Sequence, residues 1–233
     1  MKTKKIIALV LAAVMAVLSL AACGSASDKD SGKEAIKIGG IGPLTGGAAI
    51  YGSAAKNGAQ IAVDEVNALG GLQFDLRYED DVHDPEKSGT AYNTLKDWGM
   101  QISLGSVTSK PAVATSAEAA NDHIFYLTPS ASSTDVIGGV ANPLTGTVEI
   151  ERKDCVFQMC FVDPNQGSAS AKYISEKQLG TKVAVIYKND DVYSTGIYNT
   201  FVAEAEKEGL EIVSATTFAS GNDTDFSVQV KDA

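Results

Sequence analysis

Serine and threonine side chains gather in two short turns, each of which follows a predicted strand. The first turn spans residues 105–109 (GSVTS) and the second spans residues 128–133 (TPSASS). Hydroxyl groups both donate and accept hydrogen bonds, but they act as nucleophiles only beside an activating base. The two turns therefore suit the capture of a polar ligand. Because Ser and Thr also occupy ordinary turns, the composition alone leaves a purely structural role open.

The elements around the two turns would bring them together. Short apolar strands at 102–104 and 124–127 precede the turns, and Pro111 suits the first turn of a helix between them, with Ser109 as its N-cap. Neighbouring parallel strands deliver their loops to one edge of a sheet, which is where open α/β sheets bind ligands. The helix N-terminus adds free N–H groups and a positive dipole end, so we expect a site for a carboxylate or phosphate.

Other polar residues give weaker indications of chemistry. Asp80, Asp81 and Asp84 form an acidic turn that could bind a metal or act as acid and base, although a solvated strand end is the commoner role. His83 and His123 lack the spacing of metal ligands. No P-loop, nucleophile-elbow or zinc-protease motif occurs, and the glycines after the first strand have the wrong spacing for a dinucleotide loop. We therefore predict no catalytic residues, no metal and no cofactor. A metal-dependent α/β enzyme that uses the acidic turn remains the alternative.

Residues 1–22 have the organisation of a secretory signal. Three lysines lie within the first five residues, and an apolar core at 6–20 falls short of the roughly 20 residues that a membrane span requires. The following Leu-Ala-Ala-Cys resembles the lipobox of bacterial lipoproteins. This resemblance implies cleavage before Cys23, lipidation of its thiol and an anchor on the outer side of the cell membrane. Residues 23–35 are polar, which predicts a flexible tether.

The charge balance and the remaining cysteines restrict the function further. The chain has 19 basic and 29 acidic residues, and without the three signal lysines the balance is 16 against 29. Because nucleic-acid affinity depends on basic contacts to phosphate, we predict no nucleic-acid partner. Cys155 and Cys160 flank a strand-like run that would hold them roughly 16 Å apart, beyond the reach of a disulfide. We expect two half-buried thiols.

Predicted strands and helices alternate along the rest of the chain, which indicates an α/β fold with parallel sheets. A first lobe would span residues 36–162 and a second would span 163–233, where only two or three strands are present. The last helix stops at Ala233 without a stop signal, so we expect a fragment with an incomplete second lobe. The predicted strands are 36–41, 74–79, 102–104, 124–127, 155–161, 182–187 and 210–218. The predicted helices are 53–69, 86–98, a third that ends near Asn121, 166–179, 196–208 and one capped by Asn222 or Asp223.

Several short motifs occur in one order from residue 36 to the end of the chain. They include P-L-T-G-G-A-A-I-Y-G, N-A-L-G-G, Y-E-D-D with D-P, G-S before a proline, T-P-S-A-S and D-x-x-Q-G. As a set they resemble the leucine/isoleucine/valine-binding proteins, which are type I periplasmic-binding-protein-like receptors of ABC importers. The resemblance implies two Rossmann-like lobes, hinged by crossing strands, that close on an amino acid without chemistry.

The resemblance also implies ligand-binding residues by matching positions. The serines and their backbone would hold the α-carboxylate and ammonium, and two tyrosines would cover the ligand from the two lobes, unless they pack on their own lobes. Asp163 and Gln166 would lie at the crossover beside the hinge. In the family, the acid that pairs with the ammonium usually comes further along, beyond Ala233. The predicted ligand-binding residues are Tyr51, Ser106, Ser130, Ala131, Ser132 and Tyr193.

The resemblance further implies the partners and location of the protein. We expect a monomer, anchored outside the cytoplasm through Cys23, that captures a branched-chain amino acid such as leucine and docks on ABC permease subunits. A ligand-sensing lipoprotein of the same fold, which takes an amide, urea or another small ligand, is the alternative.

Overall fold

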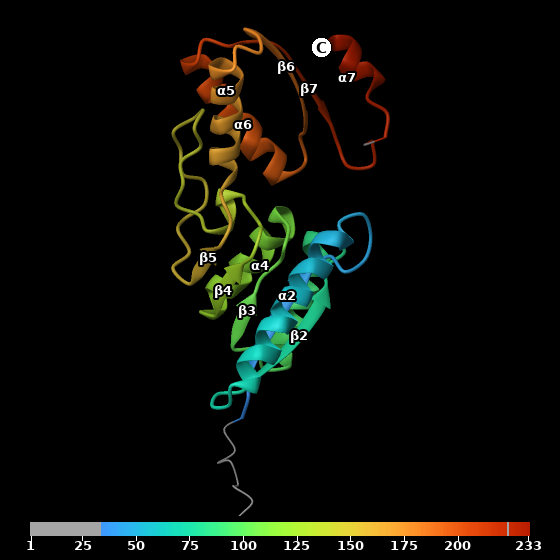
Figure 1. Cartoon of the computed structure of the whole chain (residues 1–233), viewed down its shortest axis with the longest axis vertical. Helices are drawn as coiled ribbons and strands as arrows, with labels where there is room; N and C mark the ends of the chain where they lie inside the picture. Colours follow the sequence, from blue (N-terminus) through green and yellow to red (C-terminus); the bar gives the residue numbers. More distant parts are fainter. Residues whose placement is uncertain (1–33, 223) are drawn as a thin grey trace, which may run out of the picture. The chain divides into compact units, whose positions relative to one another are not determined.

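The computed structural model describes residues 34–222 and 224–233 (Figure 1). The predicted signal peptide, the lipidation site at Cys23 and nearly all of the tether lie outside the described residues, as does Asp223. The predictions made for them therefore stay predictions. Within the described residues, no helix combines the length and the apolar character that crossing a membrane requires.

Residues 35–233 form one compact unit that contains two separate parallel sheets. We refer to residues 35–162 as the five-strand region and to residues 163–233 as the two-strand region, after the sheet that each contains. The predicted boundary between two lobes falls between these sheets. It stays a prediction, because the compact unit is not itself divided there.

The five-strand region is built on a sheet with the strand order β2-β1-β3-β4-β5. All four neighbouring pairs in this sheet are parallel. The predicted α/β fold with parallel sheets is confirmed, and β3 and β4 are direct neighbours as the two-turn arrangement requires. The strands are β1 (Ile36–Gly42), β2 (Phe74–Asp80), β3 (Ile102–Leu104), β4 (Phe125–Thr128) and β5 (Val156–Gln158).

Three helices connect these strands: α2 (Ala49–Ala68), α3 (Pro85–Asp97) and α4 (Ser109–Asp122). Helix α3 begins one residue before the predicted start at Glu86, because the Asp84 carboxylate accepts hydrogen bonds from the N–H groups of Glu86 and Lys87, both at 2.9 Å. Helix α2 begins at Ala49 rather than at Ser53, and no side chain caps it. Tyr51 therefore lies in the first turn of a helix and not in a loop.

Strand β5 is shorter than the predicted strand at 155–161. Among the described strands it pairs with β4 alone, whose four residues limit how far the pairing extends. Cys155 and Cys160 are both free and half-buried, as predicted. The segment between β4 and β5 holds the short helix η1 (Thr134–Val136) and an antiparallel bridge between Ala141 and Val148.

The two-strand region contains β6 (Lys182–Lys188) and β7 (Glu211–Phe218), with α5 (Asp163–Glu176), α6 (Val192–Lys207) and α7 (Ser227–Asp232). The two strands are parallel, α5 and α6 pack against each other, and α7 contacts β7 (Figure 1). The last helix begins later in the sequence than the predicted cap at Asn222 or Asp223 indicates. The helix begins at Ser227, whose N–H donates to the Asp225 carboxylate at 3.0 Å.

The two regions have separate hydrophobic cores. In the five-strand region, the fully buried side chains include Ile41, Tyr92, Leu95, Tyr126 and Val156. The core of the two-strand region is smaller and consists of Ala171, Phe201, Ala205 and Leu210. The larger core therefore supports the edge of the sheet where β3 and β4 end.

Candidate functional site

An open cavity of about 440 Å³ lies where β3 and β4 end, and its walls come from both regions. This volume is within the range of small-molecule sites in proteins, roughly 300–1,000 Å³. The five-strand region contributes the hydroxyl-rich turns, part of α2 and His83, while the two-strand region contributes Asp191 and Tyr193 from the start of α6. The cavity therefore combines hydroxyl, aromatic and charged side chains.

Hydrogen bonds from hydroxyl groups connect the two turns. Ser130 Oγ donates to the Val107 carbonyl at 2.6 Å, and Thr128 Oγ1 donates to the Ser106 carbonyl at 2.8 Å. The Ser109 hydroxyl accepts from the N–H of Ser133 at 3.2 Å. Several of these hydroxyl groups therefore stabilise the turns, which is the common role of Ser and Thr in turns. Ser130 and Ser132 nevertheless line the cavity.

Helix α4 begins beside the cavity, but its N-cap is not the predicted Ser109. Thr108 occupies the N-cap position with extended backbone, and Ser109 is the first helical residue. No side chain caps the helix, because the Thr108 Oγ1 lies 2.8 Å from Nδ1 of His83 instead. The first turn of α4 therefore keeps N–H groups that no side chain satisfies, and these groups attract anions.

The structure brings together four of the six residues predicted to bind the ligand. Tyr51, Ser130, Ser132 and Tyr193 all line the same cavity. Ser106 and Ala131 do not line it, and both are buried, with exposed fractions of 0% and 1%.

The buried pair is engaged by the protein itself. The N–H of Ser106 donates to the Tyr126 hydroxyl at 3.1 Å, and its Oγ accepts from Thr115 Oγ1 at 3.4 Å. The N–H of Ala131 donates to Thr128 Oγ1 at 3.0 Å, and its carbonyl accepts from the Gln158 amide at 2.7 Å. In this arrangement, Ser106 and Ala131 support the turns from behind.

Aromatic side chains face the cavity from both regions. Tyr51 is 64% exposed and Tyr193 is 38% exposed, so both rings have surface available to cover a ligand. Tyr193 lies in the first turn of α6, which begins four residues before the predicted start at Gly196. Its hydroxyl lies 3.3 Å from the Gln166 side-chain amide on α5. Phe161 also lines the cavity, although the sequence indicated only a strand end there.

The acidic turn at Asp80–Asp84 has structural roles. Burial raises the pKa of Asp80, but hydrogen bonds from Thr45, Leu44 and Val82 outweigh this effect and the net pKa is lowered. Asp84 caps α3, and Asp81 is fully buried, which raises its pKa. Within the described residues, no group of three or more His, Cys, Asp or Glu side chains could hold a metal ion.

The Asp163 carboxylate is buried at the start of α5. Its side chain is 1% exposed, and neither of its carboxylate oxygens has a hydrogen-bond partner within the described residues. Burial raises its pKa to about 6, the nearby Ser132 hydroxyl opposes the shift, and the negative charges of Asp191 and Asp135 add to it. A Cβ on Gly196 would lie 2.9 Å from Asp163 Oδ2, so the glycine is what allows α6 to approach this close.

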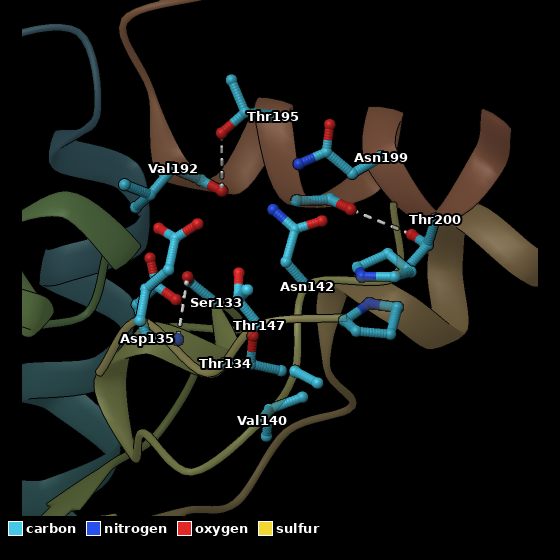
Figure 2. A pocket seen from close by; sticks show the side chains of 15 residues that line it. Ser133, Thr134, Asp135, Val140, Asn142, Thr147, Val192, Thr195, Asn199 and Thr200 are labelled. Carbon is cyan, nitrogen blue, oxygen red and sulfur yellow. Dashed lines mark hydrogen bonds between the residues drawn. The ribbon is translucent and has the colours of Figure 1, made fainter. Parts of the chain in front are cut away.

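A second cavity of about 170 Å³ lies between the segment at 133–149 and the first turns of α6 (Figure 2). Its walls are polar, and Figure 2 shows the Asn142 amide extending toward α6, which carries Asn199. Burial and the charge of Glu149 raise the pKa of Asp135 in this cavity. Among the residues that the structure describes, no aromatic side chain lines the second cavity. The first cavity is therefore better suited to a ligand with both a charged end and an apolar end.

Sequence comparisons relate the chain to known binding proteins. Residues 35–233 match the protein family described as periplasmic binding protein. A Leu/Ile/Val-binding protein of Rhizobium johnstonii is 32% identical over 196 residues, which are 82% of this chain and 49% of that protein. A Leu/Ile/Val-binding protein homolog of Brucella melitensis is 31% identical over 199 residues, or 84% and 50% of the two proteins. The chain spans about half the length of the curated relatives it matches.

Solved structures show the same relationship. The branched-chain amino acid transporter substrate-binding protein LivJ of Streptococcus pneumoniae, in complex with isoleucine, superposes with a TM-score of 0.72 at 30% identity. That match covers 85% of this chain and 53% of LivJ. A leucine-binding protein LivK of Thermotoga maritima gives a TM-score of 0.71 at 27% identity and covers 84% and 52% of the two chains.

Proposed function

Because this chain belongs to the periplasmic binding protein family, we propose that it is a solute-binding receptor that captures an amino acid outside the cytoplasm. The observation that carries the proposal is the cavity at the ends of β3 and β4. It places a helix N-terminus and hydroxyl groups beside aromatic side chains from both regions. A carboxylate is attracted to the first group and an apolar side chain to the second.

The relatives favour branched-chain amino acids as the ligand class. Both curated relatives carry Leu/Ile/Val in their names, and the LivJ structure contains isoleucine. The rings of Tyr51 and Tyr193 offer apolar surface from the two regions. We therefore place leucine, isoleucine and valine first among the candidate ligands, with Ser130 and Ser132 among the residues that contact them.

Capture in this proposal requires no chemical step. The ligand binds first to the five-strand region, and the two-strand region then closes over it by rotation about the crossover near Asp163. A ligand shifts that equilibrium only by its higher affinity for the closed form. The closed receptor, a monomer anchored through a lipid on Cys23, would deliver the ligand to ABC permease subunits.

A thermal-unfolding panel tests the ligand class. The purified full chain is scanned with leucine, isoleucine, valine, other amino acids, amides and urea. A ligand present at 100 times its dissociation constant stabilises the folded state by about 2.7 kcal/mol, which raises the unfolding temperature by a few degrees. We expect this shift with the branched-chain amino acids.

Two variants of α2 make the panel specific to the cavity. Tyr51→Ala removes a ring that lines it, while Ile50→Ala removes a neighbouring side chain that is 74% exposed and does not. We expect the ligand-induced shift to shrink in the first variant only. A shift with amides or urea alone would change the ligand class and favour a sensing role. No shift with any compound, in a cooperatively folded chain, would refute amino-acid capture.

The lipid anchor needs a separate test. Bacteria that express the wild-type chain or Cys23→Ser would be grown with radiolabelled palmitate and then fractionated. We expect label and membrane association for the wild type and neither for the variant. Equal labelling of both chains would contradict the proposal for Cys23 and leave ligand capture untouched.

A further inference from the structure

We propose that Lys110 is a positioning residue for ligand capture, because its ammonium group joins the start of α4 to the loop before α6 at the rim of the cavity. The Lys110 Nζ donates to the Asp190 carbonyl at 3.2 Å, across 80 residues of sequence. The inference rests on the proposed function and extends it. It names a contact that holds the two halves of the site together from outside the ligand-binding surface.

The contact lies directly beside the cavity on both sides. Lys110 follows Ser109 in the first turn of α4, and Ser109 lines the cavity. Asp190 precedes Asp191, which lines the cavity from the two-strand region. Lys110 and Asp190 themselves are not among the lining residues. The pair therefore connects the two regions at one rim of the site and leaves the cavity open to a ligand.

The position of Lys110 is unfavourable for α4 taken alone. The N-terminus of a helix is the positive end of its dipole, so a lysine in the first turn is repelled there. The first turn of α4 contains no acidic side chain that would offset this charge. A local conflict of this kind is typical of residues that serve a function. The favourable partners of Lys110 lie outside the helix that carries it.

One acidic side chain from each region is close enough to interact with the Lys110 charge. Backbone hydrogen bonds at the start of α3 lower the pKa of Asp84 against the opposing effect of desolvation, and the charge of Lys110 lowers it further. Hydrogen bonds from Ser220 likewise lower the pKa of Asp190 against desolvation, and the charges of Lys188 and Lys110 add to the shift. The lysine therefore lies between negative charges of both regions.

Both ends of the contact are anchored in their own regions. In the five-strand region, Ala112 follows Lys110 by two residues and is fully buried. In the two-strand region, the Asp190 carboxylate accepts from the N–H of Ser220 at 3.1 Å and 3.2 Å, just beyond the end of β7. Because each segment is fixed to its own region, the hydrogen bond between them restrains the regions relative to each other.

This restraint raises the fraction of molecules in which the two halves of the cavity face each other. The apparent dissociation constant is the intrinsic constant divided by that fraction. Lys110 is only half-buried, so loss of the contact should weaken leucine binding about two- to fivefold, as for other exposed charged contacts. Isoleucine and valine should lose the same factor, because Lys110 does not line the cavity.

Three variants of the full chain test the role of the ammonium group. Lys110→Met removes the charge and keeps an unbranched side chain, while Lys110→Arg keeps a charged donor. Lys188→Met is the matched control, because its charge also acts on Asp190 but it belongs to the two-strand region. Calorimetry measures the affinities for leucine, isoleucine and valine, and urea titration measures stability. We expect weaker binding in Lys110→Met alone.

Stability separates a positioning role from a merely structural one. Because the lysine conflicts with the dipole of α4, Lys110→Met should be as stable as the wild type or more stable while it binds more weakly. Equal binding by the wild type and Lys110→Met would show that the residue does not position the site. A loss of stability that parallels the loss of affinity would reduce Lys110 to a structural role. In either case the assignment is wrong and the receptor function stands.

A measurement without ligand separates the contact from the proposed function. Nitroxide labels are placed at the exposed positions Glu118 on α4 and Glu206 on α6, in a chain whose three cysteines are replaced by serine. Electron–electron double resonance then gives the distribution of distances between the two labels. We expect one main distance in the wild type, Lys110→Arg and Lys188→Met, and a broader distribution that reaches longer distances in Lys110→Met.

The two measurements together decide between the outcomes. Identical distance distributions for the wild type and Lys110→Met, or equal broadening in Lys188→Met, would overturn the assignment whether or not a ligand binds. If the distances change as expected but the wild type binds none of the three amino acids, the contact between the regions stands and the proposed function fails.

Discussion

The two regions bury their sheets to very different extents. In the five-strand region, the last four residues of β1 are fully buried, and Tyr92, Tyr126 and Leu95 are closed off from solvent around them. In the two-strand region, no residue of β6 or β7 is fully buried, and Val213 is 47% exposed. One half of the candidate site therefore rests on a packed core, and the other half rests on a sheet that is only partly covered.

This difference assigns different roles to the two halves of the cavity. The serine turns are supported by buried hydroxyls behind them, including that of Tyr126. His83 is held by the Asp81 carboxylate and the Thr108 hydroxyl. Asp191 directly precedes α6 and Tyr193 lies in its first turn. This helix is held mainly by its packing against α5. The five-strand half is therefore expected to be formed before the ligand arrives, while the two-strand half moves.

The largest effect is expected at Tyr126. Its ring is fully buried, and its hydroxyl contacts the N–H of Ser106 at 3.1 Å and Thr115 Oγ1 at 2.8 Å. Tyr126→Ala should lower the free energy of unfolding by about 3–5 kcal/mol, as for other large aromatic truncations in cores. Urea titration followed by circular dichroism measures the change, and ligand binding should be lost with it.

Phe125 provides the matched control for this prediction. It precedes Tyr126 in the same strand, but it is 46% exposed and stacks only on Phe157, with ring centroids 5.2 Å apart. Phe125→Ala should cost about 1 kcal/mol or less and preserve binding. Equal losses for the two variants would contradict the view that a packed core beneath the serine turns preforms this half of the site.

The second effect concerns the pH dependence of stability at Asp163. Burial raises its folded-state pKa to about 6 from an ordinary value of 3.8. An acid with a raised folded-state pKa destabilises the folded protein progressively as the pH rises from about 4 to 6, by about 3 kcal/mol for this shift. Above pH 6 the penalty is constant. Asp163→Asn should therefore gain stability relative to the wild type over that window.

Thermal unfolding of both proteins between pH 4 and pH 7.5 tests this prediction. Asp81 and Asp135 also have raised pKa values, so the wild type alone would mix several titrations. The difference between the wild type and Asp163→Asn isolates one group, because the other carboxylates are common to both. Parallel curves across the window would show that the Asp163 carboxylate is solvated in solution.

The order of elements and the adjacency of the two turns could be predicted from the sequence. Both follow from local patterns: short apolar strands, helices of ordinary length and turns rich in Gly, Ser and Thr. The family resemblance drawn from the motifs is confirmed by the match over residues 35–233. Exposed and half-buried residues alternate along β6, which is typical of one-sided burial, although its run of apolar residues indicates a buried strand.

The details that the sequence could not supply depend on residues far apart in the chain. Thr108, at the N-cap position of α4, makes no capping hydrogen bond because its hydroxyl is engaged by His83, 25 residues earlier. Ser106 lies behind the cavity because the Tyr126 hydroxyl meets it there. The burial of Asp163 follows from the approach of Gly196. No local pattern encodes these contacts, so His83 and Asp191 were missed as cavity residues.

The smallest of the three effects is expected at Gly167, whose substitution should destabilise the two-strand region alone. Gly167 lies where α5 meets α6, and a Cβ there would lie 2.5 Å from the Ile197 carbonyl oxygen and 2.8 Å from the Phe201 nitrogen. Backbone atoms cannot rotate away, so Gly167→Ala should cost about 1–3 kcal/mol by overpacking. Gly89→Ala in α3 meets nothing within 4 Å and should instead stabilise the chain by about 0.5–1 kcal/mol. Hydrogen exchange should show faster exchange in α5 and α6 of the first variant while β1 and β3 stay protected. If β1 and β3 lose protection to the same degree, the two regions unfold as one unit, and the contrast between a preformed half-site and a moving one is wrong.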